Sequence, residues 1–239
     1  MSEALYELGG LRFWTGREIA VREHCITTLK FELQQALLGL NGAWRFERME
    51  GPLLTPRRFI SDAYDDNDIF MLQAKLGEDD AALRAETTMS SYLYAMHCLQ
   101  KGFRMPLCVW QAGKSFRRET SDGARASTLR YNEFYQLEFQ CIFANSTKAD
   151  YHSVAIPAVE RAIRNLVHAT KSRIVESDRL PIYSTQTLDV EVEWNGAWKE
   201  MASISTRTDF LKADTTVLEV AVGLDRLIAV EEVNRNQIL

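Results

Sequence analysis

Three segments of the chain repeat apolar residues at the spacing of an α-helix. The first opens with Thr15-Gly16-Arg17-Glu18, a capping box, and its pattern stops at the glycines within residues 39–42. The second covers about residues 86–101 and is followed by a glycine, and the third begins near Pro157, a residue favoured in a first turn. The stripes predicted to face the core are Ile19, Ile26, Leu29, Leu33 and Leu37; Met89, Leu93, Met96 and Leu99; and Val159, Ile163, Leu166 and Val167.

Much of the remaining chain is rich in β-forming residues, and several of its runs alternate apolar and polar positions with the period of a strand. Two joins, Asp122-Gly123 and Asn195-Gly196, are typical of tight hairpins and favour antiparallel pairing. Residues 43–56 indicate a strand entering a proline-bounded turn, and residues 223–233 a short helix directly after a strand. The pattern predicts an α+β fold with a mostly antiparallel sheet. The main predicted strands are 106–112, 133–144, 187–194, 198–205 and 216–222.

The composition is that of an ordinary globular protein, with 46% apolar and 26% charged residues in a chain of 239. At a net charge of −5, any contact with nucleic acid depends on a local basic patch. The start of the chain does not resemble a leader, no apolar run is long enough to span a bilayer, and no linker divides the sequence, so we expect one cytoplasmic domain over residues 1–239. Four separate cysteines are predicted to be buried free thiols: Cys25, Cys98, Cys108 and Cys141.

The strand predicted around residues 134–143 has two different faces. One is a core face, made of Tyr135, Leu137, Phe139, Cys141 and Phe143. The other is aromatic at one end and polar along its length, made of Phe134, Gln136, Glu138 and Gln140. The polar face is either a solvated side of the sheet or the floor of a site, where an aromatic ring stacks on a flat ligand and a carboxylate binds an amine.

A lone glutamate, Glu219, interrupts the apolar run of residues 216–222. A buried carboxylate without a partner is costly, so Glu219 needs a cation, a metal or an ammonium group. Gly223 would allow the backbone to approach a ligand closely, and Arg226 would project from the first turn of the next helix. The alternative is a glycine at an ordinary strand-to-helix turn and a surface arginine.

Four arginines fall within fourteen residues: Arg117, Arg118, Arg125 and Arg130. A guanidinium stays charged and binds phosphate oxygens in pairs, so such a cluster suits a polyphosphate. A solvated hairpin tip with scattered charges is the alternative. Taken with the two strands, the cluster describes a nucleotide site with an amine-binding corner.

Five segments in order resemble class II aminoacyl-tRNA synthetases. "FRRET…LRYNEFYQLEF" is similar to their motif 2, "LEVAVGLDRLIAV" to motif 3, and "RFERMEGPLLTP" to motif 1, with Pro52 at the proline that builds the family's dimer interface. "LRAET" and "SISTRTDF" resemble the L-R-P-E-T and I-A-N-R-T-D-Y segments of homodimeric glycyl-type enzymes. The resemblance spans roughly residues 40–230 and implies a homodimer with a class II fold.

The resemblance also implies roles for single residues. Arg117 would bind the α-phosphate of ATP, Glu119 the adenine amino group and Arg226 the γ-phosphate, while Phe134 would stack on adenine; Arg130 is assigned to the same ATP site. The amino-acid site would consist of Glu86, Glu138, Glu219 and Ala221, with Glu219 also a candidate ligand of Mg²⁺. Arg117 and Arg226 would be the catalytic pair in forming an aminoacyl-adenylate.

The chain departs from the pattern at informative places. Ala221 stands where glycyl-type enzymes carry serine, which puts glycine selectivity in doubt, and Asn132 replaces the arginine of R-E-F. Arg118 stands for Asn in FRNE and Ala85 for Pro in LRPE. The chain stops about nine residues beyond motif 3, so we expect no C-terminal anticodon-binding domain.

Three hypotheses follow. The first is a ligase that activates a small amino acid, glycine first, and passes it to a tRNA acceptor stem or to another acceptor. The second is an inactive relative acting as a binding, regulatory or polymerase-accessory subunit. The third is an unrelated α+β protein. Retention of Arg117, Glu119, Phe134 and Arg226 favours the first.

Overall fold

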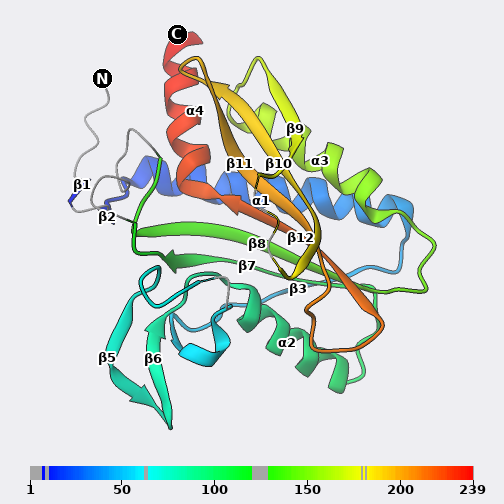
Figure 1. The fold of residues 1–239 in the computed structure, drawn as a ribbon. Helices are drawn as coiled ribbons and strands as arrows, with labels where there is room; N and C mark the ends of the chain where they lie inside the picture. The colour runs from blue at the N-terminus through cyan, green and yellow to red at the C-terminus, as the bar shows by residue number, and fades with distance from the viewer. Residues whose placement is uncertain are drawn as a thin grey trace.

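A seven-stranded sheet organises the molecule (Figure 1). The computed structural model describes residues 7–8, 11–61, 64–119, 129–178, 180 and 182–238. Every neighbouring pair in this sheet is antiparallel except β3 with β7, so the α+β prediction is confirmed. In spatial order the strands are β3 (Arg45–Arg48), β7 (Leu107–Phe116), β8 (Glu133–Ala144), β12 (Thr215–Gly223), β11 (Ala197–Arg207), β10 (Ser184–Trp194) and β9 (Ser172–Glu176).

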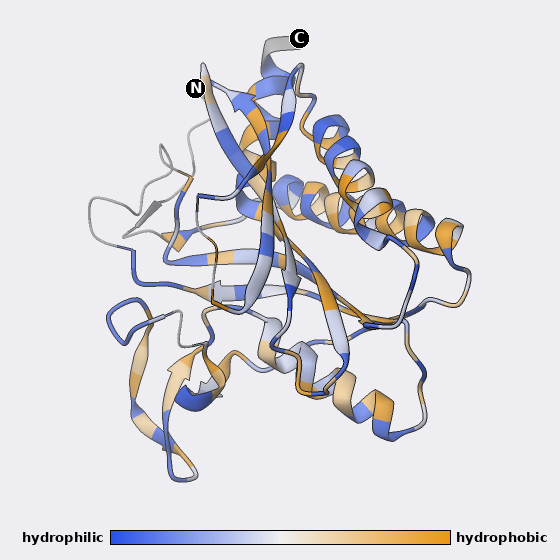
Figure 2. Ribbon diagram, turned by 45° about the vertical axis from the view of Figure 1, so that its right-hand side comes forward, coloured by the Kyte–Doolittle hydropathy of each residue, from blue (hydrophilic) through white to orange (hydrophobic). Residues whose placement is uncertain are grey.

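One face of the sheet is covered by three helices, α1 (Gly16–Leu40), α3 (Tyr151–Leu166) and α4 (Leu224–Ile238). Their apolar sides join the core faces of β8 and β12 in the main hydrophobic cluster. Hydrophobic and hydrophilic residues lie on opposite sides of α3 (Figure 2), whereas α1 also exposes Ile19, Phe31 and Leu40. No helix in the described part of the chain is long and apolar enough to cross a membrane.

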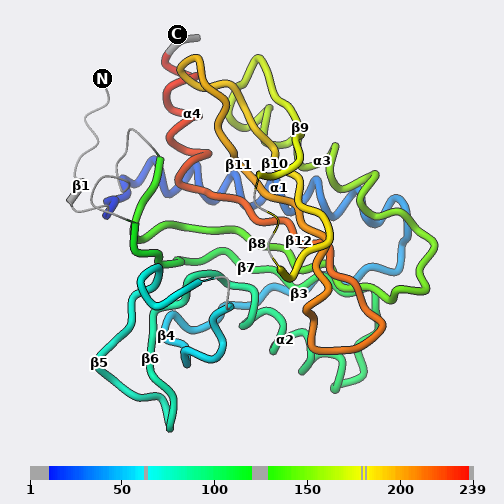
Figure 3. The backbone as a smooth tube through the Cα atoms, in the orientation of Figure 1, coloured from blue at the N-terminus to red at the C-terminus, as the bar shows by residue number. Residues whose placement is uncertain are grey.

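The other face of the sheet is shared between α2 (Thr88–Gln100), a small second sheet and a polar region. The small sheet has the order β4 (Leu54–Pro56), β6 (Asp79–Leu83), β5 (Met71–Leu76), with a short 3₁₀ turn η1 (Arg57–Phe59) after β4. α2 and the small sheet lie on the side of β7 and β8 away from α1 (Figure 3). The polar region is bordered by the sheet, the start of α2, and the residues Ser177 and Tyr183, which follow β9 and precede β10.

The capping box at the start of α1 is confirmed. Thr15 Oγ1 accepts a hydrogen bond from the backbone N–H of Glu18 at 3.2 Å, and Glu18 Oε2 accepts from the backbone N–H of Thr15 at 2.7 Å. The predicted stripe is right from Ile26 onwards but wrong at Ile19, which is exposed, whereas Cys25 is buried. Ile19 lies in the first turn of α1 and is 40% exposed.

Two further boundaries differ from the prediction. The helix expected at Pro157 begins at Tyr151, because the Asp150 side chain caps it by accepting from the backbone N–H of Ser153, and Pro157 lies inside it. The helix expected from residue 86 begins at Thr88, and its predicted stripe is wrong at Leu93, which is exposed, because the fully buried face carries Tyr92, Ala95 and Cys98. The sequence analysis also missed β1 (Glu7–Leu8), β2 (Leu11–Arg12), β5, β6 and β9, which are all short strands.

The main strands match their predictions closely. β8 covers the predicted 133–144, and Asn195-Gly196 joins β10 to β11 with positive φ at both residues, as a tight hairpin requires. The cysteines are free and buried as predicted. Asp122-Gly123 lies outside the described residues.

Candidate active site

A cavity of about 270 Å³ opens on the polar face of β8 and β12. Nine residues that the sequence assigned to an ATP or amino-acid site line this one cavity: Glu86, Arg117, Glu119, Arg130, Phe134, Glu138, Glu219, Ala221 and Arg226. Pro52, assigned to a dimer interface, lies outside it and is exposed. Arg118 is exposed as well, and Arg125 falls outside the described residues. The solvated-face alternative for β8 is wrong, because Gln136, Glu138 and Gln140 are all buried.

The acidic end of the cavity contains Glu86, Glu138 and Glu219. Glu138 on β8 and Glu219 on β12 lie on paired strands, where Glu219 is opposite Gln140 and Glu138 is opposite Ala221. Burial raises the pKa of Glu138 to about 8, and the charges of Glu219 and Glu86 act in the same direction. Burial likewise raises the pKa of Glu86, an effect that Arg207 opposes. Three carboxyl groups gathered in one buried corner suit a ligand that carries an ammonium group.

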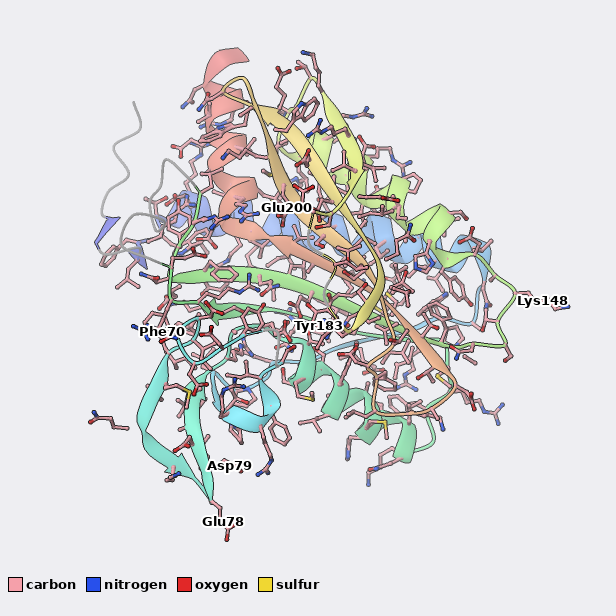
Figure 4. All side chains as sticks on the ribbon, in the orientation of Figure 1. Phe70, Glu78, Asp79, Lys148, Tyr183 and Glu200 are labelled. Carbon is pink, nitrogen blue, oxygen red and sulfur yellow. The ribbon has the colours of Figure 1, made fainter. Side chains whose placement is uncertain are left out.

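Arg207 completes the acidic end, and the sequence reading gave it no role. Its Nη1 donates to Glu219 Oε2 at 2.9 Å, and its Nε and Nη2 donate to Asp209 at 3.1 and 2.7 Å. The guanidinium lies 3.7 Å from the ring centroid of Tyr183, the residue directly before β10 (Figure 4). Burial by itself would lower the pKa of Arg207, but Glu219 and Asp209 raise it. Glu219 therefore already has a cation of the chain as its partner.

Arg117 and Phe134 lie between the two ends of the cavity. The Arg117 guanidinium is 5.2 Å from the ring centroid of Phe134 and also 5.2 Å from that of Tyr64. Arg117 Nε donates to the backbone oxygen of Ala85 at 3.2 Å, which fixes the side chain against the segment that carries Glu86. A flat ring could stack on Phe134 while its phosphate approaches Arg117.

The basic end contains Arg130 and Arg226. Arg130 Nη1 lies 3.5 Å from Glu119 Oε2, and Arg226 Nη1 lies 3.3 Å from Glu200 Oε1. Arg226 Nε also donates to the backbone oxygen of Leu129 at 3.3 Å. Glu200 lies on β11 near the start of α4 (Figure 4). These arginines can bind an anionic ligand once they release their carboxylate partners.

Three more acidic residues line the cavity or its wall and were missed: Asp189, Glu200 and Asp225. Asp189 and Glu200 come from the paired strands β10 and β11, and burial, together with the charge of Glu200, raises the pKa of Asp189. Asp225 Oδ2 accepts from the backbone N–H of Tyr135 at 2.6 Å, and burial raises the pKa of Asp225 to about 7. The signal that could have identified Asp225 is its place directly before Arg226.

A metal site is less well defined. Among the described residues, no group of three or more His, Cys, Asp or Glu is arranged to hold an ion. Glu219 Oε2, the predicted Mg²⁺ ligand, already accepts from Arg207, Gln140 and Thr88. The assignment of Mg²⁺ to Glu219 stays a prediction. Glu219 Oε2 is poorly suited to bind the ion, because three donors already occupy this oxygen.

Residues 70–230 match the family model of the tRNA synthetase class II core domain (G, H, P, S and T). The chain is 31% identical over 182 residues to glycine–tRNA ligase of Mesoplasma florum, which covers 63% of this chain and 40% of that protein. It is 28% identical over 179 residues to the same ligase of Thermobifida fusca, covering 72% of this chain and 36% of the relative. The chain thus matches about two-fifths of the length of these relatives.

A solved structure with a similar fold is Giardia lamblia prolyl-tRNA synthetase in complex with prolyl-adenylate. It superposes with a TM-score of 0.68 at 18% identity, over 95% of this chain and 48% of that one. The resemblance of fold therefore extends across nearly all of the present chain.

Proposed function

Since the chain belongs to the family of class II tRNA synthetase core domains, we propose that its cavity binds ATP and a small amino acid and joins them into an aminoacyl-adenylate. The observation that carries this proposal is the convergence of nine separately predicted residues on one cavity. They come from segments as far apart in the chain as Glu86 and Arg226, and they divide into an acidic end for an amine and a basic end for phosphates.

In the proposed reaction, a carboxylate oxygen of the amino acid attacks the α-phosphorus of ATP. A new O–P bond forms, the bond from the α-phosphorus to its bridging oxygen breaks, and pyrophosphate leaves with the electron pair. Arg117 would neutralise the charge that develops at the α-phosphate, and Arg226 would bind the γ-phosphate. Positioning and charge neutralisation carry such a step without a covalent intermediate on the protein.

The residues present fit ATP, because Phe134 offers a ring platform, Arg117 lies 5.2 Å from that ring, and Arg130 and Arg226 line the same cavity. Mg²⁺ would supply further neutralisation of the phosphates. Asp189 and Glu200, at the same end of the cavity as Arg226, have the oxygen donors that this ion prefers and are better placed for it than Glu219.

The amino acid, acceptor and assembly are further parts of the proposal. Glycine is the first candidate, because the relatives above are glycine–tRNA ligases. The acceptor is a tRNA acceptor stem or a non-tRNA molecule, in the cytoplasm. A homodimer would use the exposed segment Pro52–Leu54, where Leu53 and Leu54 leave 42% and 48% of their surface uncovered.

The test is ATP–pyrophosphate exchange with each of the twenty amino acids, starting with glycine, alanine and serine. We expect exchange with a small amino acid and its loss in Arg117→Ala. The matched control is Arg118→Ala, an exposed arginine next in the chain, which should leave exchange unchanged. Absence of exchange with every amino acid would overturn the proposal and favour the inactive binding or regulatory subunit.

A further inference from the structure

Two carboxylates of the acidic end share a set of uncharged donors. Gln140 Nε2 donates to Glu219 Oε2 at 2.7 Å and lies 3.5 Å from Glu138 Oε2. Thr88 Oγ1, in the first turn of α2, lies 3.1 Å from Glu219 Oε2 and 3.3 Å from Glu138 Oε2. Thr87 Oγ1 donates to Glu138 Oε2 at 2.5 Å. Gln140 and Thr88 therefore bridge two acidic side chains.

All the hydrogen bonds found among the described residues for these two carboxylates end on Oε2. At Glu138 the contacts come from Thr87, Thr88 and Gln140, and at Glu219 from Thr88, Gln140 and Arg207; the single hydroxyl proton of Thr88 serves one of the two carboxyl groups at a time. Both glutamates line the cavity, so their second oxygens remain for a ligand. An ammonium group has three N–H donors and can reach more than one such oxygen.

The bridging residues are fully enclosed. Gln140 has no exposed surface and Thr88 has 2%. Gln140 Oε1 is buried without a hydrogen-bond partner, so the amide directs its NH₂ to the carboxylates while its own carbonyl oxygen stays unpaired. Leaving this carbonyl oxygen unpaired costs free energy, and the hydrogen bonds of the NH₂ group to the carboxylates offset that cost.

The charge of the bridge is as important as its geometry. Arg207 is the one cation hydrogen-bonded to Glu219 in the described structure, and it also binds Asp209. An amide and a hydroxyl orient the carboxylates without adding positive charge, so the corner keeps its attraction for a cationic ligand. A lysine in place of Gln140 would fill the same space and cancel that attraction.

We propose that Gln140 and Thr88 are positioning residues of the amino-acid site, which hold Glu138 and Glu219 with one oxygen of each facing the cavity. They set the affinity for the ammonium group of the substrate without contacting ATP. That the ligand is an amino acid rests on the proposed function above. That Gln140 and Thr88 orient the two carboxyl groups does not depend on it.

The kinetic test uses Gln140→Met and Thr88→Val in the exchange reaction. Losing a hydrogen bond to a charged group should raise KM for the amino acid about tenfold, while KM for ATP stays within about twofold. Thr88→Ser, which keeps the hydroxyl, should restore KM for the amino acid. The control is Thr215→Val, a buried threonine of β12 outside the cavity, which should change neither constant. Equal rises in both KM values would overturn the proposal.

A second measurement does not depend on activity. Titration of ¹³C-labelled glutamate carboxyl groups by NMR, with Glu138 assigned through Glu138→Gln, follows its ionisation directly. Removing the Gln140 donor should move this titration to higher pH, because the donor favours the ionised pair. An unmoved titration in both Gln140→Met and Thr88→Val would overturn the proposal. If the Gln140 variant does not fold, the titration of Glu138 is compared between Thr88→Val and Thr88→Ser, and equal titrations in the two variants would overturn the proposal. Failure of exchange with every amino acid, together with a moved titration, would refute the proposed function alone.

Discussion

The acidic end and the basic end of the cavity are built from different kinds of structure. Glu138, Glu219 and Arg207 project from central strands, are almost fully buried and are hydrogen-bonded to one another or to α2. At the basic end the Arg226 and Glu200 side chains are 30% and 46% exposed, and Arg130 is exposed too. The acidic end is formed before any ligand binds, whereas the arginines of the basic end must exchange carboxylate partners for phosphates.

This difference suggests that the two ends contribute differently to stability. A buried ion pair that loses one partner leaves an uncompensated charge, while an exposed pair contributes little. The same variant type placed at each end should therefore give very different unfolding curves.

The largest effect is expected for Arg207→Met. It leaves Glu219 without its cation in a buried corner and should lower the free energy of unfolding by about 3–5 kcal/mol. Arg226→Met, the matched variant at the basic end, should cost less than about 1 kcal/mol. Urea unfolding measures both, and equal losses would contradict the distinction between the two ends.

A smaller effect is expected from pH. The pKa of Glu138 is raised from 4.5 to about 8, so between these values the folded protein holds a proton that the unfolded chain has lost. The free energy of unfolding should fall as pH rises through this window, by at most about 1.4 kcal/mol per pH unit. Above pH 8 this contribution should level off.

The Glu138→Gln variant isolates the effect of this one carboxyl. Its stability curve should lack the decline that Glu138 contributes, while the slope from Asp225, whose pKa is also raised, remains. Urea midpoints from pH 4.5 to 8.5 provide the measurement. A wild-type curve parallel to that of Glu138→Gln would show that Glu138 is ionised throughout.

The smallest effect is expected for Ala221→Ser. The hydroxyl adds volume beside Glu219 and Glu138, so it should favour glycine over alanine in the exchange reaction by about threefold to tenfold. Exchange with glycine serves as the internal control. An unchanged ratio would place Ala221 away from the substrate's α-carbon.

Part of the acidic end could be predicted because β8 and β12 are long strands, and the family resemblance assigned Glu138 and Glu219 to one site. Period-2 spacing fixes which side chains share a face, and so Glu138 and Glu219 were placed on the site face of β8 and β12. Arg207 was missed because the partner of a buried charge lies on another strand, at a register that the spacing of one strand cannot give.

The predicted helix and strand boundaries were wrong where two local sequence signals compete. Pro157 suits a first turn, yet the Asp150 cap starts the helix at Tyr151, and Pro157 lies on the exposed side of a helix whose other side is buried in the core. The β5–β6 hairpin was missed because β5 has no fully buried residue and its pairing is interrupted by an irregularity.

The most direct test of the proposed function is a single turnover with α-³²P-labelled ATP and glycine, alanine or serine in separate reactions, at enzyme in excess over ATP. We predict that one small amino acid yields labelled aminoacyl-adenylate and an equal amount of pyrophosphate, and that Arg117→Ala yields neither. If ATP and the amino acids bind but no adenylate forms with any of them, the central claim is contradicted.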